Sequence, residues 1–150
     1  MDVGKRLLLK GGVALAALAA LPRTLLAAMW PEEAFAATEA DAAMSTLFGT
    51  NQATASDQIT LKVPEIAENG AVVPVTISTT LGNVESISIV VENNPRPLAA
   101  SFEIPAGTLP NVSNRIKMGE TSDVIAVVKT DAGLYSTSKQ VKVTIGGCGG

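Results

Sequence analysis

Apolar and polar residues alternate along the chain between residues 59 and 145. The alternation is clearest in ITLKV, VESISIVVE and KQVKVTI, and a period of two is typical of a strand with one buried face. Valine and isoleucine dominate these segments, which favours strands around an aliphatic core. In chain order, the predicted strands are ITLKV, AVVPVTIST, VESISIVVE, LAASFEI, NVSNRIKM, DVIAVVKT and LYSTSKQVKVTI.

Short turn sequences separate the predicted strands. They are too short for the helical crossovers that join parallel strands, and about seven strands at this spacing predict an immunoglobulin-like antiparallel β-sandwich over residues 57–145. Asn69-Gly70 suits a turn with positive φ. Pro74 indicates an edge position or a bulge, because proline cannot donate a hydrogen bond to the ladder.

A helical pattern precedes the strands. Thr38 followed by Asp41 resembles a capping box, and AAMSTLF continues with good helix formers up to Gly49, which can close the helix. We therefore predict one short amphipathic helix, Thr38 to Phe48. With the polar connector NQATASDQ, it makes up a segment of residues 37–56.

The first 36 residues have the layout of an export signal. Basic residues among the first ten are followed by an Ala/Leu-rich run and by the small-x-small sequence AFA at residues 34–36, which predicts cleavage after Ala36. A retained membrane anchor is the weaker alternative, because Pro22 and Arg23 interrupt the run before the roughly 20 apolar residues of a membrane span.

The sequence GKRLLLK resembles a twin-arginine signal, S-R-R-x-F-L-K, with Lys5 at the position of the first arginine. General secretion remains the alternative route because of Lys5. Either route takes the mature chain out of the cytoplasm, and the periplasm is the expected location.

Composition narrows the chemistry. The chain has no histidine, which removes the usual general base and the usual imidazole metal ligand, and one cysteine cannot supply the three or four ligands of a zinc site. The net charge is −3, and no run of Lys or Arg occurs beyond the first ten residues, so nucleic-acid binding is not expected. We predict no catalytic residue, no metal site and no cofactor.

The chain ends in GGCGG, directly after its longest predicted strand. Glycine admits backbone conformations that other residues avoid, so the tail is predicted to be a flexible arm, residues 146–150, that presents an accessible thiol. An exposed single thiol is readily oxidised outside the cytoplasm, which suggests that it carries something covalently. The residues of the arm are Gly146, Gly147, Cys148, Gly149 and Gly150.

This tail, together with the export signal and the Ile/Val-rich sandwich, resembles the SoxY family, the sulfur-carrier subunits of the bacterial thiosulfate-oxidising (Sox) system. The resemblance implies that Cys148 is the covalent attachment site for sulfur intermediates such as a persulfide. It also implies that the chain is a carrier and not an enzyme.

The same resemblance implies a set of periplasmic partners. A SoxZ-like β-sandwich subunit would form a heterodimer with the carrier, and a SoxXA-like haem c-type cytochrome complex would join thiosulfate to the cysteine. A SoxB-like sulfate thiohydrolase would then release sulfate, and a SoxCD-like sulfur dehydrogenase would act in systems that have one. Neither nucleic acid nor a membrane is an expected partner of the mature form.

Two questions stay open from the sequence. The chain could instead be an exported structural or adhesive β-sandwich module that is crosslinked through Cys148. The surface for a partner is also unassigned, with the Pro74 region and an exposed face of VESISIVVE as the candidates.

Overall fold

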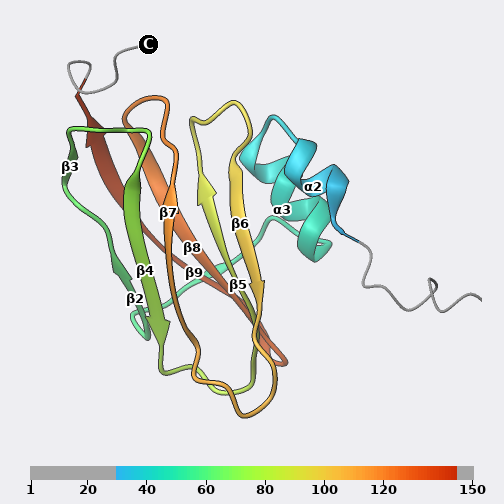
Figure 1. Cartoon of the computed structure of the whole chain (residues 1–150). Coiled ribbons are helices and arrows are strands. Elements are labelled where there is room, and N and C mark those ends of the chain that lie inside the picture. Colours follow the sequence, from blue (N-terminus) through green and yellow to red (C-terminus); the bar gives the residue numbers. More distant parts are fainter. Residues whose placement is uncertain (1–29, 145–150) are drawn as a thin grey trace, which may run out of the picture. The chain divides into compact units, whose positions relative to one another are not determined.

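The computed structural model describes residues 30–144 and contains two β-sheets and two short helices (Figure 1). Each predicted strand segment contains a strand, so the mainly β fold is confirmed. The helices are α2 (Glu32–Ala36) and α3 (Ala40–Phe48). The strands are β1 (Thr54–Ala55), β2 (Ile59–Lys62), β3 (Ile66–Ala67), β4 (Val73–Thr79), β5 (Val84–Val91), β6 (Leu98–Glu103), β7 (Asn111–Ile116), β8 (Ser122–Thr130) and β9 (Gly133–Val143).

The two sheets face each other as a sandwich. The larger sheet has the strand order β1-β9-β8-β5-β6, with β3 also paired to β9, and the smaller sheet has the order β2-β4-β7. The long ladders are antiparallel, as predicted. The two-residue strands β1 and β3 differ, because both pair in parallel with β9, and segments so short carry no recognisable pattern in the sequence.

The core between the sheets is aliphatic, as the composition predicted. Its centre includes Ile77, Ile87, Ile89 and Val128, which have no exposed surface. Burying one such side chain stabilises the fold by about 1.5–3 kcal/mol. The alternation in sequence is visible as alternating burial, for example buried and exposed residues in turn along β2.

Strand β5 departs from the half-buried strand that its alternation suggested. It lies between β6 and β8, and every residue from Ser86 to Val91 is buried. The hydroxyls of Ser88 and Ser101 form a hydrogen bond of 2.9 Å, which satisfies a buried polar group. The suggestion that an exposed face of VESISIVVE binds a partner is therefore wrong.

Pro74 occupies a locally unpaired edge of β4. Strand β2 pairs with β4 only from Thr76 to Thr79, whereas β7 pairs with it along Val73 to Ser78. At Pro74, β4 therefore has a neighbour on one side only. The predicted edge position is confirmed at this residue, although β4 is the central strand of its sheet.

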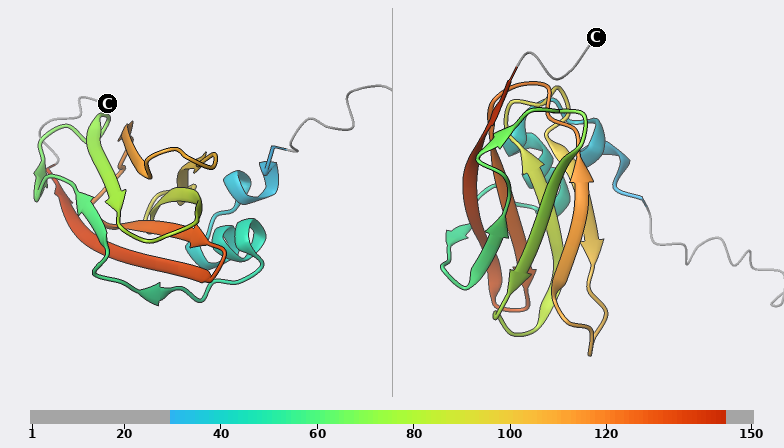
Figure 2. Two further views of the ribbon diagram at one scale, coloured as in Figure 1. Left: turned by 90° about the horizontal axis from the view of Figure 1, so that it is seen from below. Right: turned by 60° about the vertical axis from the view of Figure 1, so that its left-hand side comes forward.

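The two helices cover part of the outer face of the larger sheet (Figure 2). Helix α3 ends at Phe48 and is closed by Gly49 with φ of 77°, as predicted. Its start differs, because the N-cap is Glu39 and no side chain caps the helix, so the capping box from Thr38 is wrong. Helix α2 was not predicted and lies within the segment assigned to the export signal.

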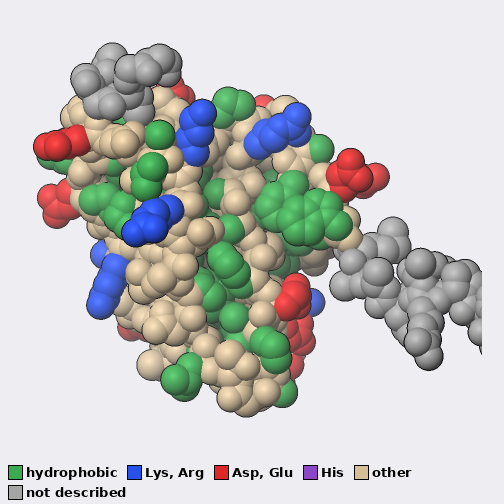
Figure 3. All heavy atoms as spheres, viewed as in Figure 1, with side chains coloured by type: hydrophobic (Ala, Val, Ile, Leu, Met, Phe, Trp, Pro, Cys, Tyr) green, Lys and Arg blue, Asp and Glu red, His purple; other side chains and the backbone are tan. Residues whose placement is uncertain are grey.

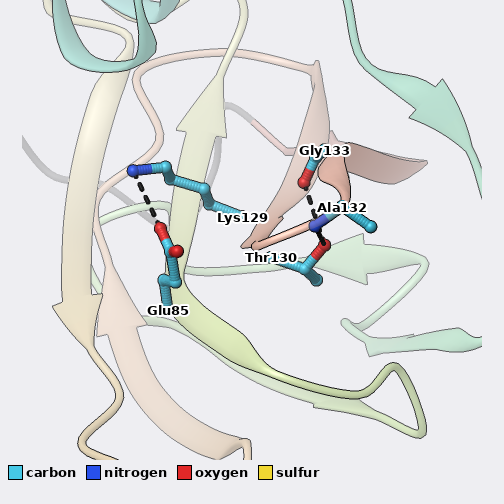
Figure 4. Close-up of polar contacts among 5 residues, drawn as sticks. All are labelled: Glu85, Lys129, Thr130, Ala132 and Gly133. Carbon is cyan, nitrogen blue, oxygen red and sulfur yellow. Dashed lines mark hydrogen bonds and ion pairs between the residues drawn. The ribbon is translucent and has the colours of Figure 1, made fainter.

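A tight hairpin joins β8 to β9 and sets the register of the longest ladder (Figure 4). The Thr130 hydroxyl accepts a hydrogen bond from the Ala132 N–H at 3.1 Å and donates one to the Gly133 carbonyl at 3.2 Å. Gly133 has φ of 151°. These contacts hold the start of β9 in register with β8.

An ion pair beside this hairpin should contribute little to stability. The Lys129 ammonium lies 2.9 Å from the Glu85 carboxylate, and both side chains are about half exposed, at 48% and 47% (Figure 4). We expect Lys129→Met to lower the free energy of unfolding by no more than about 1 kcal/mol, because water screens the pair. Urea unfolding with and without added salt measures this effect. The prediction is contradicted if Lys129→Met loses more stability than this and added salt causes the same loss in the unmodified chain.

Candidate functional site

The predicted site residues Gly146, Gly147, Cys148, Gly149 and Gly150 lie outside the described residues. The structure describes the chain up to Thr144. For the candidate site, the structure therefore shows only the last residues of the sandwich before the predicted arm. We call residues 141–144 the arm root.

Hydrogen bonds hold the arm root on both edges. The N–H groups of Lys142 and Thr144 donate to the carbonyls of Glu65 and Ala67, at 3.0 and 3.2 Å, which is the parallel pairing with β3. On the opposite edge, the Val143 N–H donates to the Thr121 hydroxyl at 3.0 Å. The backbone is thus fixed to within four residues of Cys148.

Packing beneath the arm root is close. Val141 has no exposed surface. A Cβ added at Gly70 would lie 2.4 Å from the Met118 carbonyl oxygen and 2.9 Å from Val143 Cγ1. The Met118 N–H donates to the Gly70 carbonyl at 2.7 Å. Only glycine fits this position without displacing the backbone.

Gly70 therefore has a different role from the one predicted. The turn at Asn69 exists, because the Asn69 side chain accepts a hydrogen bond from the Ala71 N–H at 3.0 Å. Gly70 is not among the positive-φ residues of the described chain, however, so the positive-φ prediction is wrong. The absence of a side chain at Gly70 lets the Met118 backbone approach closely. Because the two residues are far apart in sequence, no local pattern predicts this contact.

One cavity of the sandwich lies away from the arm root. A cavity of about 640 Å³ is lined by the β4–β5, β6–β7 and β8–β9 connections, including Leu81, Pro105 and Asp131. These connections lie at the end of the sandwich opposite the arm root (Figure 1). This cavity therefore does not adjoin the arm root.

The described residues do not offer a metal site. Within residues 30–144, no group of three or more His, Cys, Asp or Glu side chains is close enough to hold a metal ion. Basic and acidic side chains are scattered over the face seen in Figure 3. Among the same residues, no helix is both long and apolar enough to cross a membrane.

Comparison with known proteins places these features in a family. The family model described as sulfur oxidation protein SoxY matches residues 44–148, so the match includes Cys148. Among curated proteins, no sequence matches.

A solved structure agrees with the family match. The sulfur carrier protein SoxY from Chlorobium limicola f thiosulfatophilum is 41% identical, with a TM-score of 0.64, over 70% of this chain and 96% of that chain. A superoxide reductase (neelaredoxin) from Ignicoccus hospitalis is 17% identical, with a TM-score of 0.52, over 58% of this chain and 80% of that one. That second likeness concerns the fold alone. The family match over more than half of the chain, with the SoxY structure at 41% identity, means that this protein belongs to the SoxY family.

Proposed function

We propose that this chain is a periplasmic carrier that holds sulfur intermediates covalently on Cys148 and presents them to partner enzymes. The observation that carries the proposal is the placement of the thiol. It lies in a glycine-flanked tail that follows a strand hydrogen-bonded on both edges up to Thr144. Membership of a family that includes a solved sulfur carrier protein supports the same role.

The length of the tail suits delivery into another protein. Cys148 lies four residues beyond Thr144, so an extended chain would place its Cα at most roughly 14 Å from that of Thr144. The flanking glycines carry no side chains that would widen this segment. The fixed arm root would act as a stop that sets how far the thiol can reach into a partner.

The proposed chemistry is a transfer at sulfur. In the first step, the Cys148 thiol loses its proton, a sulfur–sulfur bond forms to the outer sulfur of thiosulfate, and two electrons pass to an oxidising haem c-type cytochrome partner. In the second step, water cleaves the bond between the outer sulfur and the sulfonate. Sulfate and a proton leave, and a persulfide remains on Cys148.

The described residues have no role in these bond changes under the proposal. The chain has no histidine to act as a base, so we assign activation of the thiol to the partners and no cofactor to the carrier. The proposed partners are a SoxZ-like subunit in a heterodimer, a SoxXA-like cytochrome complex and a SoxB-like hydrolase, with a SoxCD-like dehydrogenase where present. The basic and apolar N-terminal sequence supports export to the periplasm.

Intact mass spectrometry tests the proposal directly. Protein isolated from thiosulfate-grown cells of a Sox-containing bacterium should carry adducts of one or more sulfur atoms, or of a thiosulfonate group, and a reductant should remove them. Peptide mapping should place every adduct on Cys148. Unmodified thiol and simple disulfide dimer as the only species under these conditions would contradict the carrier function.

A further inference from the structure

Helix α2 is part of the folded domain, although its sequence lies in the segment assigned to the export signal. Ala34 has no exposed surface. It belongs to the apolar cluster that includes Val90, Leu98 and Val127 of the larger sheet, and the partly buried Phe35 packs against this cluster. The compact unit that contains the sandwich begins at Pro31.

A polar contact ties the end of α2 to the sandwich. The Arg96 guanidinium donates a hydrogen bond to the Ala36 carbonyl at 3.0 Å. This carbonyl is at the last residue of α2, where the helix itself leaves its carbonyl groups without partners. Arg96 lies in the connection between β5 and β6, sixty residues away in sequence.

These contacts conflict with cleavage after Ala36. The small-x-small stretch that a signal peptidase would recognise is helical from Ala34 to Ala36, and the first of the three residues is buried. Cleavage there would also remove Ala34 and Phe35 and expose the apolar sheet face beneath them. Exposed apolar patches of this kind favour aggregation.

We infer that the signal peptidase cuts upstream of Pro31, so that the mature chain keeps α2. The inference rests on the proposed export of the protein. The unit that folds with the sandwich begins at Pro31, and the apolar run and Arg23 precede it in the sequence.

N-terminal sequencing of the exported protein tests the position of the cut. The full chain, produced in a Gram-negative host, should have its mature N-terminus at Pro31 or upstream of it, and Ala36→Leu should not change it. An N-terminus at Ala37, with precursor accumulating in Ala36→Leu, would overturn the inference.

A second measurement does not depend on export. In the full chain, Ala34→Leu should lower the melting temperature by several degrees because the site is already filled. The matched variant Ala36→Leu, at an exposed position of the same helix, should leave it nearly unchanged. If the wild-type chain is never exported but Ala34→Leu still lowers the melting temperature, the proposed periplasmic location is refuted, whereas the inclusion of α2 in the domain is supported. Equal melting temperatures for the two variants would refute that inclusion.

Discussion

Replacing Cys148 by serine is expected to abolish sulfur transfer completely while leaving the fold intact. A serine hydroxyl cannot form the sulfur–sulfur bond on which the proposed cycle depends, and the chain has no other thiol. A strain that carries Cys148→Ser as its only copy should therefore not oxidise thiosulfate. Thiosulfate consumption by the strain, with intact mass spectrometry of the purified variant, measures the loss.

The melting temperature of Cys148→Ser serves as the control for folding. It should equal that of the unmodified chain, because the substitution lies beyond the arm root that the structure describes. The crosslinked structural module predicts a different pattern, in which loss of the thiol reduces oligomer size and leaves thiosulfate oxidation unaffected. Glycines inserted before Gly146 separate the two roles further, since a crosslink should tolerate a longer tail better than a carrier whose reach is set by its root.

The second large effect is expected at Gly70. Gly70→Ala should lower the free energy of unfolding by about 1–3 kcal/mol, because the new Cβ would lie 2.4 Å from a backbone oxygen that cannot move alone. The strain should fall on the pairing of Met118 with Gly70 and on Val143. Urea unfolding measures the stability, and hydrogen exchange at the Val143 and Thr144 amides reports the local effect.

Gly82→Ala is the matched control for this prediction. No atom lies within 4 Å of the Cβ that would be added at Gly82. Its stability should stay close to that of the unmodified chain, since the lost flexibility of the unfolded chain offsets a small local cost. Similar stability losses in the two variants would show that close packing beneath the arm root is not the cause.

The strand pattern predicted most of the fold because alternation reports which residues of a strand face a core. It succeeded for β2, whose residues are buried and exposed in turn, and for β4 at Pro74. It misjudged β5, where Ser86 and Ser88 mimic a solvent-facing side but are buried. A small polar side chain can be buried when it finds a hydrogen-bond partner, as Ser88 does in Ser101.

The amino-acid sequence by itself determined the chemistry proposed for this protein. The single thiol, its position among four glycines and the absence of histidine are covalent facts that need no fold. The strands were also predictable, because a period of two in side-chain polarity is a local property of the chain.

Only the tertiary structure decided how the arm is held and where the domain begins. The pairing of β3 with the end of β9, the close approach of Met118 to Gly70 and the burial of Ala34 in one cluster with Val90 each join segments far apart in sequence. Such contacts depend on which elements become neighbours in space. A local pattern of apolar and polar residues does not encode that choice.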